Sequence, residues 1–475
     1  MNSFYWYDYE TFGADPVRDR PVQFAGIRTD HDLNPLASPL SLFCRPAPDY
    51  LPSPDACLIT GITPGFALER GVSEASFIAA IDAEFSVAGT CVAGYNSIRF
   101  DDEVTRHTLY RNLMDPYARE WRNGNSRWDL IDAMRMARAL RPEGIEWPLD
   151  DTGRPVFRLE RLTAANGITH AHAHDAVSDV EATIALARLL KTRQPRLFEF
   201  LFDHRSKQAA GRLLGLGSMM PLLHVSSRYP AERHCLAVVV AVARHPDNPN
   251  GVVVYDVSVD PQPLLSLPVE TLVARLYTTA AELPEGVSRL PLKTVHLNKC
   301  PALAPMKALR PEDVERLQLD LARCETHLAA LRDAPDLSSR VQAIVGSAEP
   351  RPPSDPDLAL YEGFVPDADR RVLERLRGLP PSAMGQASAD FEDPRLSALW
   401  FRYRARNFPD TLEADAIARW EAFRRQRLTE PSAQGFRTLE AFEARLGDIA
   451  AQGTLSAAQQ GILAELEAYG RSLLV

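Results

Sequence analysis

Short runs of aromatic and β-branched residues alternate with longer amphipathic stretches over the first 190 residues. The short runs are bounded by turn residues, which is typical of strands, and they cover residues 4–10, 24–29, 40–44 and 90–94. The longer stretches repeat apolar residues at helical spacing, and they cover residues 73–85, 102–113, 128–140, 159–166 and 175–190. This order predicts an α/β domain over residues 1–190, in which helices flank a mixed sheet.

The pattern changes after a linker that we expect at residues 191–195. A helical stretch, 197–214, leads into short strands at 235–243, 251–257 and 294–297. Short strands of this kind favour a small β-barrel over residues 195–348. A proline-rich segment at 349–356 marks a second boundary, and residues 351–475 have a helical pattern. Three domains agree with the roughly 150 residues per domain that are usual in a chain of 475 residues.

Composition and charge exclude several classes of protein. Hydrophobic residues make up 45% and charged residues 24% of the chain, which excludes a largely disordered or fibrous protein. The net charge of −10 excludes a uniformly basic coat for nucleic acid, although it leaves room for a local basic channel. The six cysteines have no CxxC spacing, and we expect reduced thiols in a cytoplasmic protein. The first residues lack a secretory signal pattern, and the longest apolar run, 235–243, is too short to span a membrane.

Two carboxylates, Asp8 and Glu10, lie two positions apart on a strand that is otherwise Phe, Tyr and Trp. Residues i and i+2 of a strand point to the same face, so these carboxylates would lie side by side. Two adjacent anions repel each other unless a cation lies between them, and hard oxygen ligands suit Mg²⁺ or Mn²⁺. The alternative is a solvent-facing edge of the strand.

Further candidates lie where strands lead into helices. Asp101 follows the strand at 90–94, at the kind of junction where α/β folds often form sites, although Asp101 or Asp102 could simply cap the next helix. His174 immediately precedes the helix predicted at residues 175–190. Asp175 is a candidate N-cap of this helix, and Asp179 lies in its second turn. Histidine suits proton transfer from water near neutral pH. Asp179 could be an exposed helix residue, yet it borders a face that we expect to be buried.

The order of these residues, D-x-E, then N-x-x-x-F-D, then H-x-x-x-x-D, resembles the DEDDh branch of the DEDD 3′→5′ exonucleases. Several segments narrow the resemblance to the bacterial exonuclease I family; they are residues 7–13, 99–106, 125–130, 140–145, 191–197, 298–301, 309–313 and 403–409. The resemblance extends over nearly the whole chain. No catalytic position departs from the pattern of the family.

The resemblance implies a ribonuclease H-like exonuclease domain, an SH3-like β-barrel domain and a helical C-terminal domain. It also implies processive 3′→5′ hydrolysis of single-stranded DNA to 5′-mononucleotides, with two Mg²⁺ ions for which Mn²⁺ could substitute. Asp8, Glu10 and Asp179 would hold one ion, and Asp8, with Asp101 acting through water, would position the second. His174 would deprotonate the attacking water.

Contacts to the DNA strand require cations for phosphates and flat rings for bases. By resemblance the strand would meet Glu10, Arg106, Tyr117, Trp121, Arg135 and Arg158. Each aromatic residue could instead pack in a core, and each arginine could lie on a solvated helix face. Residues 402–406 also mix arginines with aromatic residues, which fits either a DNA-binding patch or a salt-bridged helix surface.

The family further implies a monomer that acts in recombination and mismatch repair. It implies a protein partner, the acidic C-terminal tail of single-stranded-DNA-binding protein, for which Arg141, Lys207 and Arg310 are candidate contacts. A DEDDh enzyme acting on RNA is an alternative, because the sequence does not reveal whether the site rejects a 2′-hydroxyl. A non-catalytic adaptor would be favoured by loss of a metal carboxylate, and all four are present.

Three alternating histidines, His170, His172 and His174, form a separate candidate. On a strand they would share a face and could bind zinc together. No acid or cysteine completes such a site, and His174 already has a role in the exonuclease pattern.

Overall fold

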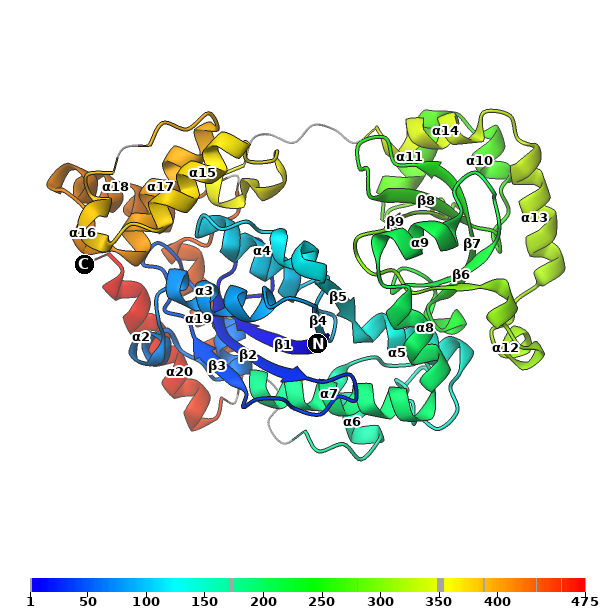
Figure 1. Cartoon of the computed structure of the whole chain (residues 1–475), viewed down its shortest axis with the longest axis horizontal. Coiled ribbons are helices and arrows are strands. Elements are labelled where there is room, and N and C mark those ends of the chain that lie inside the picture. Colours follow the sequence, from blue (N-terminus) through cyan, green and yellow to red (C-terminus); the bar gives the residue numbers. More distant parts are fainter. Residues whose placement is uncertain are drawn as a thin grey trace. The chain divides into compact units, whose positions relative to one another are not determined.

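The computed structural model describes residues 2–170, 175–279, 281–347, 354–387, 389–432, 434–453 and 455–474. Contacts within the chain divide it into two compact units. The first unit comprises residues 1–126, 171–181 and 352–475, and the second comprises residues 127–170 and 182–351. Figure 1 shows the elements of both units, coloured along the sequence.

The first sheet is mixed, as predicted, and its strand order is β3-β2-β1-β4-β5. The strands are β1 (Ser3–Thr11), β2 (Pro21–Thr29), β3 (Leu40–Phe43), β4 (Thr90–Gly94) and β5 (Ser126–Asp129). The central strand β1 pairs antiparallel with β2 and parallel with β4. Because every residue of β1 except Asp8 is buried, the strand accommodates its nearly continuous run of Phe, Tyr and Trp.

Strand β5 corrects the prediction of a single helix over residues 128–140. Trp128 and Asp129 belong to the strand, and helix α5 (Leu130–Leu140) begins after them. Asp129 sets this boundary, because its backbone is extended and its side chain accepts a hydrogen bond from the N–H of Ile131. The apolar spacing of the helix continues back into an apolar strand, so periodicity alone did not separate the two.

Helices of the first unit come from both ends of the sequence. The N-terminal part contributes α1 (Pro54–Thr60), α2 (Pro64–Arg70), α3 (Glu74–Phe85), α4 (Asp101–Arg111) and the short 3₁₀ helices η1 (Ala118–Glu120) and η2 (Arg122–Gly124). The C-terminal part is helical, as predicted: η5 (Pro356–Tyr361), α15 (Asp367–Arg377), α16 (Pro381–Met384), α17 (Pro394–Asn407), η6 (Pro409–Thr411), α18 (Ala414–Thr429), α19 (Leu439–Ala451) and α20 (Ala457–Ser472).

Hydrophobic clusters join these elements to the sheet. One cluster combines β1 and β2 with α3 and contains Tyr5, Tyr7, Tyr9, Phe24, Phe77 and Phe85. Another brings the two ends of the sequence together, because Phe12 and Val22 share it with Phe442, Leu466 and Tyr469. Helix α20 accordingly packs against α1 and α2, and Figure 1 shows α20 beside α2.

A buried ion network lies in the C-terminal part of the first unit. Asp357 is 1% exposed and lies 3.0 Å from Arg402, 2.7 Å from Arg406 and 2.8 Å from Arg427. Asp49 adds a 2.6 Å contact to Arg406. Burial alone would raise the pKa of these aspartates, but the arginines hold both pKa values below the usual range. This network favours the salt-bridged interpretation of residues 402–406.

The second unit contains an antiparallel sheet with the order β10-β6-β7-β8-β9. The strands are β6 (Leu222–Val225), β7 (Leu236–Arg244), β8 (Gly251–Asp256), β9 (Leu292–His296) and β10 (Leu303–Pro305). The three longer strands were predicted. Strands β6 and β10 were missed because, at four and three residues, they are too short to display a period.

The helices of the second unit correct two expectations. The helix predicted over 197–214 is in fact two helices, α8 (Pro195–Asp203) and α9 (Lys207–Leu214). The linker expected at 191–195 is reduced to Gln194, because α7 (Ala176–Arg193), which begins in the first unit, continues to Arg193 and α8 begins at Pro195. Proline suits the first helical position because it lacks an N–H.

The remaining helices of the second unit lie before, between and after the strands of its sheet in the chain. They are α5, α6 (Leu159–Ala165), η3 (Ala231–Arg233), α10 (Gln262–Ser266), α11 (Val269–Tyr277), η4 (Met306–Ala308), α12 (Pro311–Arg316), α13 (Leu321–Asp333) and α14 (Leu337–Val345). All six cysteines are free thiols, as expected. Within the described residues, no helix combines the length and apolar character that a membrane crossing requires.

Candidate active site

Asp8 and Glu10 lie on one face of the central strand β1, and the tyrosines between and beside them lie on the other. Tyr7 and Tyr9 belong to the hydrophobic cluster beneath the sheet, so alternation along the strand places both carboxylates on the opposite face. Glu10 is 9% exposed and pairs in register with Gln23 of β2. The pattern D-x-E therefore sits in the middle of a sheet, and the alternative of a solvent-facing strand edge is wrong.

The first turn of α7 brings a third carboxylate to this face. Asp175 caps the helix, because its side chain accepts a hydrogen bond from the N–H of Ser178 at 3.3 Å. The amide of Gln23 donates to the other oxygen of Asp175 at 3.1 Å, which attaches the helix to β2 beside Glu10. As a result, one carboxylate oxygen from each of Asp8, Glu10 and Asp179 lies within 4.8 Å of the other two.

The fourth carboxylate, Asp101, is the first residue of α4 and is 4% exposed. It accepts a hydrogen bond from the backbone N–H of Tyr9 at 3.3 Å, between the two acids of β1. The approach is close because β4 ends in Gly94: a Cβ there would lie 2.9 Å from the carbonyl oxygen of Tyr7. The four acids singled out by the sequence are thus gathered around one strand.

Burial and mutual repulsion disfavour the ionised forms of these acids. Burial raises the pKa of Asp8 well above its ordinary value, and the charges of Asp101 and Asp179 add to the shift. Burial also raises the pKa of Glu10 to about 9, with further contributions from Asp8, Asp179 and Asp175. A divalent cation would reverse this balance by pairing with the carboxylates. An all-oxygen donor set of this kind fits Mg²⁺ or Mn²⁺.

Metal binding should therefore release protons and strengthen as the pH rises. Because the pKa of Glu10 lies near 9, its carboxyl carries a proton at pH 7, and a cation must displace that proton. We expect Mn²⁺ binding at pH 7 to release about one proton or more and its apparent affinity to rise between about pH 6 and pH 9. Calorimetric titration in buffers of different ionisation enthalpy measures the proton release. Glu10→Gln should lower the number of protons released. A pH-independent affinity without proton release would contradict the raised pKa of Glu10.

The histidine part of the pattern lies mostly outside the described residues. His174, the expected general base, and His172 fall in the range 171–174, so their roles stay predictions. His170 is described, and its Nδ1 lies 3.3 Å from the hydroxyl of Thr163. The zinc site proposed for the three histidines is likewise untested.

The expected DNA contacts in the first unit fall into two kinds. Arg106 is 3% exposed and pairs with Glu103 at 3.0 Å and with Glu120 at 2.7 Å. Tyr117 is half-buried beneath the guanidinium of Arg106. Trp121, in contrast, is 64% exposed. The buried residues organise the surface around α4, and Trp121 offers an open ring for stacking.

Two aromatic residues beside this surface were missed in the sequence. Phe364 is 78% exposed, and its ring packs edge-on against Tyr117 with 6.1 Å between centroids. Tyr361 is 56% exposed and hydrogen-bonds to Arg106 at 3.1 Å. The only local signal is that both aromatics lie shortly after the proline-rich boundary with Glu362 and Gly363 between them.

The candidate contacts in the second unit differ in exposure. Arg135 is buried and pairs with Asp132 at 2.6 Å, whereas Arg158 is exposed immediately before α6. Two of the three cations considered for an acidic peptide, Arg141 and Arg310, lie 3.3 Å and 3.0 Å from Asp313. The third, Lys207, is the exposed first residue of α9.

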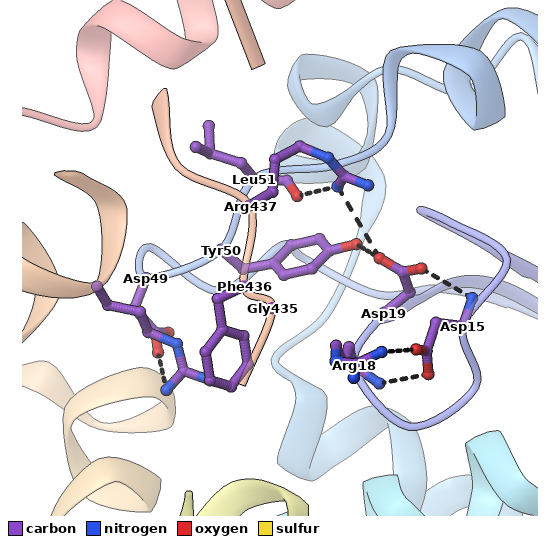
Figure 2. A pocket seen from close by; sticks show the side chains of 10 residues that line it. Asp15, Arg18, Asp19, Asp49, Tyr50, Leu51, Gly435, Phe436 and Arg437 are labelled. Atoms are coloured by element: carbon purple, nitrogen blue, oxygen red, sulfur yellow. Dashed lines mark hydrogen bonds and ion pairs between the residues drawn. The ribbon is translucent and has the colours of Figure 1, made fainter. Parts of the chain in front are cut away.

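A cavity of about 220 Å³ lies beside the turn that follows Glu10 in the chain (Figure 2). Asp19 accepts hydrogen bonds from the Tyr50 hydroxyl at 2.7 Å and from the N–H of Asp15 at 2.9 Å. Arg18 donates to the carbonyl of Gln434 at 2.7 Å, and Arg437 donates to that of Leu51 at 2.8 Å. These polar groups are thus hydrogen-bonded within the protein, and they attach the turn at residues 12–20 to residues 434–437.

Family models match three consecutive parts of the chain. They are described as Exonuclease, over residues 5–187, Exonuclease I SH3-like domain, over residues 205–346, and Exonuclease I C-terminal domain, over residues 354–473. This succession confirms the expected fold class, in which an exonuclease domain precedes an SH3-like domain and a helical C-terminal domain.

Relatives and solved structures match over nearly the whole chain. The exodeoxyribonuclease I of Escherichia coli (strain K12) is 49% identical over 437 residues, which is 92% of each chain. The structure of a moderately thermophilic exonuclease I from Methylocaldum szegediense has a TM-score of 0.96 and 59% identity, and all of both chains is covered. A zinc-bound form of an E. coli exonuclease I complex with single-stranded DNA has a TM-score of 0.95 and 46% identity, again covering both chains completely. The chain therefore belongs to the exonuclease I family.

Proposed function

We propose that this chain is a processive 3′→5′ exonuclease that hydrolyses single-stranded DNA to 5′-mononucleotides and depends on Mg²⁺. The cluster of Asp8, Glu10, Asp101 and Asp179 carries the proposal, because three of these carboxylates have oxygens within 4.8 Å of one another and the fourth accepts a hydrogen bond from the backbone of the same strand. Supporting it, the full-length E. coli relative is an exodeoxyribonuclease I, and a solved member of the family is a complex with single-stranded DNA.

The four acids have separate tasks in this proposal. Asp8, Glu10 and Asp179 would hold one divalent ion, and Asp8 with Asp101 would position a second, with Mn²⁺ as a possible substitute for Mg²⁺. Two such ions supply charge neutralisation for the attacking and leaving oxygens of a phosphodiester. Glu10 would also contact the terminal nucleotide. The raised pKa values of Asp8 and Glu10 support these tasks, because they mark a site that is completed by positive charge.

Two further side chains complete the chemistry that we propose. His174 would accept the proton of the attacking water, since an imidazole suits this transfer at neutral pH. Arg158 is exposed and would neutralise the scissile phosphate. Trp121 and Tyr117, with Phe364 and Tyr361 beside them, would stack on bases of the incoming strand, while Arg106 and Arg135 would hold the surfaces that line its path.

The enzyme would work in the cytoplasm as a monomer in DNA repair and recombination. Its protein partner would be the acidic C-terminal tail of single-stranded-DNA-binding protein. Arg141 and Arg310 would contact this tail, because their side chains pair with Asp313 but remain 29% and 30% exposed, with Lys207 as a further contact. A binding titration with a peptide that ends in acidic residues, against Arg310→Ala, tests this part separately.

An end-labelled digestion assay tests the activity. We expect metal-dependent release of 5′-mononucleotides from single-stranded DNA, little release from duplex DNA or RNA, and complete loss with EDTA. Preference for RNA would move the chain to the ribonuclease branch of the DEDDh enzymes, because only contacts to the 2′-hydroxyl separate the two sugars. Binding without cleavage in the presence of Mg²⁺ would refute the proposal in favour of a strand-binding adaptor.

A further inference from the structure

Asp101 and Asp102 are neighbours in the first turn of α4, but their side chains have different hydrogen-bond partners. Asp101 faces β1 and accepts the N–H of Tyr9. Asp102 is 1% exposed, and its Oδ1 accepts hydrogen bonds from the hydroxyl of Tyr7 at 2.9 Å and from Nη2 of Arg119 at 2.7 Å. The second acid is therefore a core residue, although it directly follows a residue of the active site.

Arg119 occupies an unusual place for a cation. Its side chain is 0% exposed, and its guanidinium lies 4.9 Å from the ring centroid of Phe85. Its Nε and Nη1 have no hydrogen-bond partner among the described residues. Removing a buried charge from water is costly unless a counterion is present, so Arg119 and Asp102 depend on each other. Arg119 also neutralises Asp102, which leaves the negative charge of this region on the four acids that face the cation site.

The hydrogen bond between Tyr7 and Asp102 joins the two elements that carry Asp8 and Asp101. Tyr7 precedes Asp8 in β1, and Asp102 follows Asp101 in α4. One contact between β1 and Asp101 is a long hydrogen bond of 3.3 Å, near the upper limit for an N–H donor. The shorter bonds to Asp102 are charge-assisted and correspondingly stronger. Together with the 3.2 Å hydrogen bond between the hydroxyls of Thr105 and Tyr9, the bonds to Asp102 hold α4 at a set distance from β1.

We propose that Tyr7, Asp102 and Arg119 form a positioning network that holds Asp101 at the correct distance from Asp8 for the second divalent ion. The inference rests on the proposed function of the four acids. Two-metal catalysis uses ions about 3.5–4 Å apart, and catalytic groups must be held to within roughly 0.5 Å. A small shift of the first turn of α4 would move Asp101 out of that range without altering Asp8, Glu10 or Asp179.

Tyr7→Phe tests the network, and Tyr5→Phe is its matched control. Both tyrosines lie on the same face of β1, both are 2% exposed, and both pack edge-on against Phe85. The difference is the hydroxyl: that of Tyr7 donates to Asp102, whereas that of Tyr5 has no hydrogen-bond partner among the described residues. Each substitution removes one oxygen atom and leaves the aromatic packing in place.

For Tyr7→Phe we expect kcat on single-stranded DNA to fall about tenfold and the Mg²⁺ concentration for half-maximal rate to rise by a similar factor, as is typical when the support of a metal ligand is lost. KM for the oligonucleotide and all parameters of Tyr5→Phe should stay within about twofold. A purely structural role would lower the melting temperature of Tyr7→Phe and leave its metal dependence unchanged, and that result would overturn the inference.

Calorimetric titration of each variant with Mn²⁺ separates this inference from the proposed function. Weaker Mn²⁺ binding in Tyr7→Phe than in Tyr5→Phe supports the positioning network even if the unaltered protein hydrolyses no DNA, a result that would refute the exonuclease proposal alone. Equal Mn²⁺ binding and equal metal dependence in the two variants would refute the network and leave the exonuclease proposal intact.

Discussion

Asp179→Ala is expected to lower the rate of single-stranded DNA hydrolysis by about 10³-fold or more. In the proposed site Asp179 would share a cation with Asp8 and Glu10, because one carboxylate oxygen of each residue lies within 4.8 Å of the others. A metal ion contributes several kcal/mol of charge stabilisation in the transition state, and about 4 kcal/mol corresponds to roughly 10³-fold in rate. The side chain lies in the first turn of a long helix, so the fold should tolerate its loss.

Rate and binding must be measured together to interpret this variant. Oligonucleotide affinity should remain measurable, because the proposed stacking surface around Trp121 is unchanged. Glu181→Ala is the matched control, since Glu181 is an exposed acid on the same helix, and its rate should stay within about twofold of the unaltered protein. Hydrolysis by Asp179→Ala at an undiminished rate would refute the assignment of this residue to a metal.

Asp357→Asn is expected to lower the free energy of unfolding by about 3–5 kcal/mol, the usual effect of removing one partner from a buried ion pair. Asp357 is 1% exposed and contacts three arginines at 2.7–3.0 Å. Asparagine has nearly the same shape but leaves Arg402, Arg406 and Arg427 with less negative charge around them. Denaturant unfolding measures the loss. Asp367→Asn, which breaks an exposed pair with Arg370, should change stability by no more than about 0.5 kcal/mol.

The pH dependence of stability gives a second measurement of the same network. The pKa values of Asp49 and Asp357 lie below their ordinary values in the folded protein. These groups therefore stabilise the fold above about pH 4, the unfolded pKa of aspartate, and the contribution is lost as the pH falls below that value. Asp357→Asn should reduce the loss of unfolding free energy as the pH falls below about 4. An unchanged loss would contradict the role of Asp357 in this network.

The strand that carries Asp8 and Glu10 could be predicted because its pattern depends on local rules. Alternation along a strand is enough to place Asp8 beside Glu10 on one face. A capping residue, Asp175, is enough to begin α7, and Asp179 lies in the first turn of this helix rather than in the second turn that was expected. Such residues need only their neighbours in sequence to be interpreted, and the structure gathers them as expected.

Other features depend on partners that are distant in sequence. Nothing local distinguishes Asp101 from Asp102, and the difference comes from Tyr7 and Arg119 on separate elements. The arginines at 402 and 406 have the composition of a DNA-binding patch, but their acidic partners include Asp49, more than 350 residues earlier. Whether a cation faces solvent or a buried carboxylate is a property of tertiary packing, and a one-dimensional pattern does not contain it.

The cluster that combines Phe12 and Val22 with Phe442 and Tyr469 can form only late in synthesis, because its members come from both ends of the sequence. Ribosomes add roughly 5–20 residues per second, so about 20–90 s separate the synthesis of Phe12 from that of Tyr469. During that time the turn beyond Glu10 lacks the helices that cover it. A nascent chain therefore carries all four acids long before their support is complete, and nuclease activity should appear only after the last helix has left the ribosome.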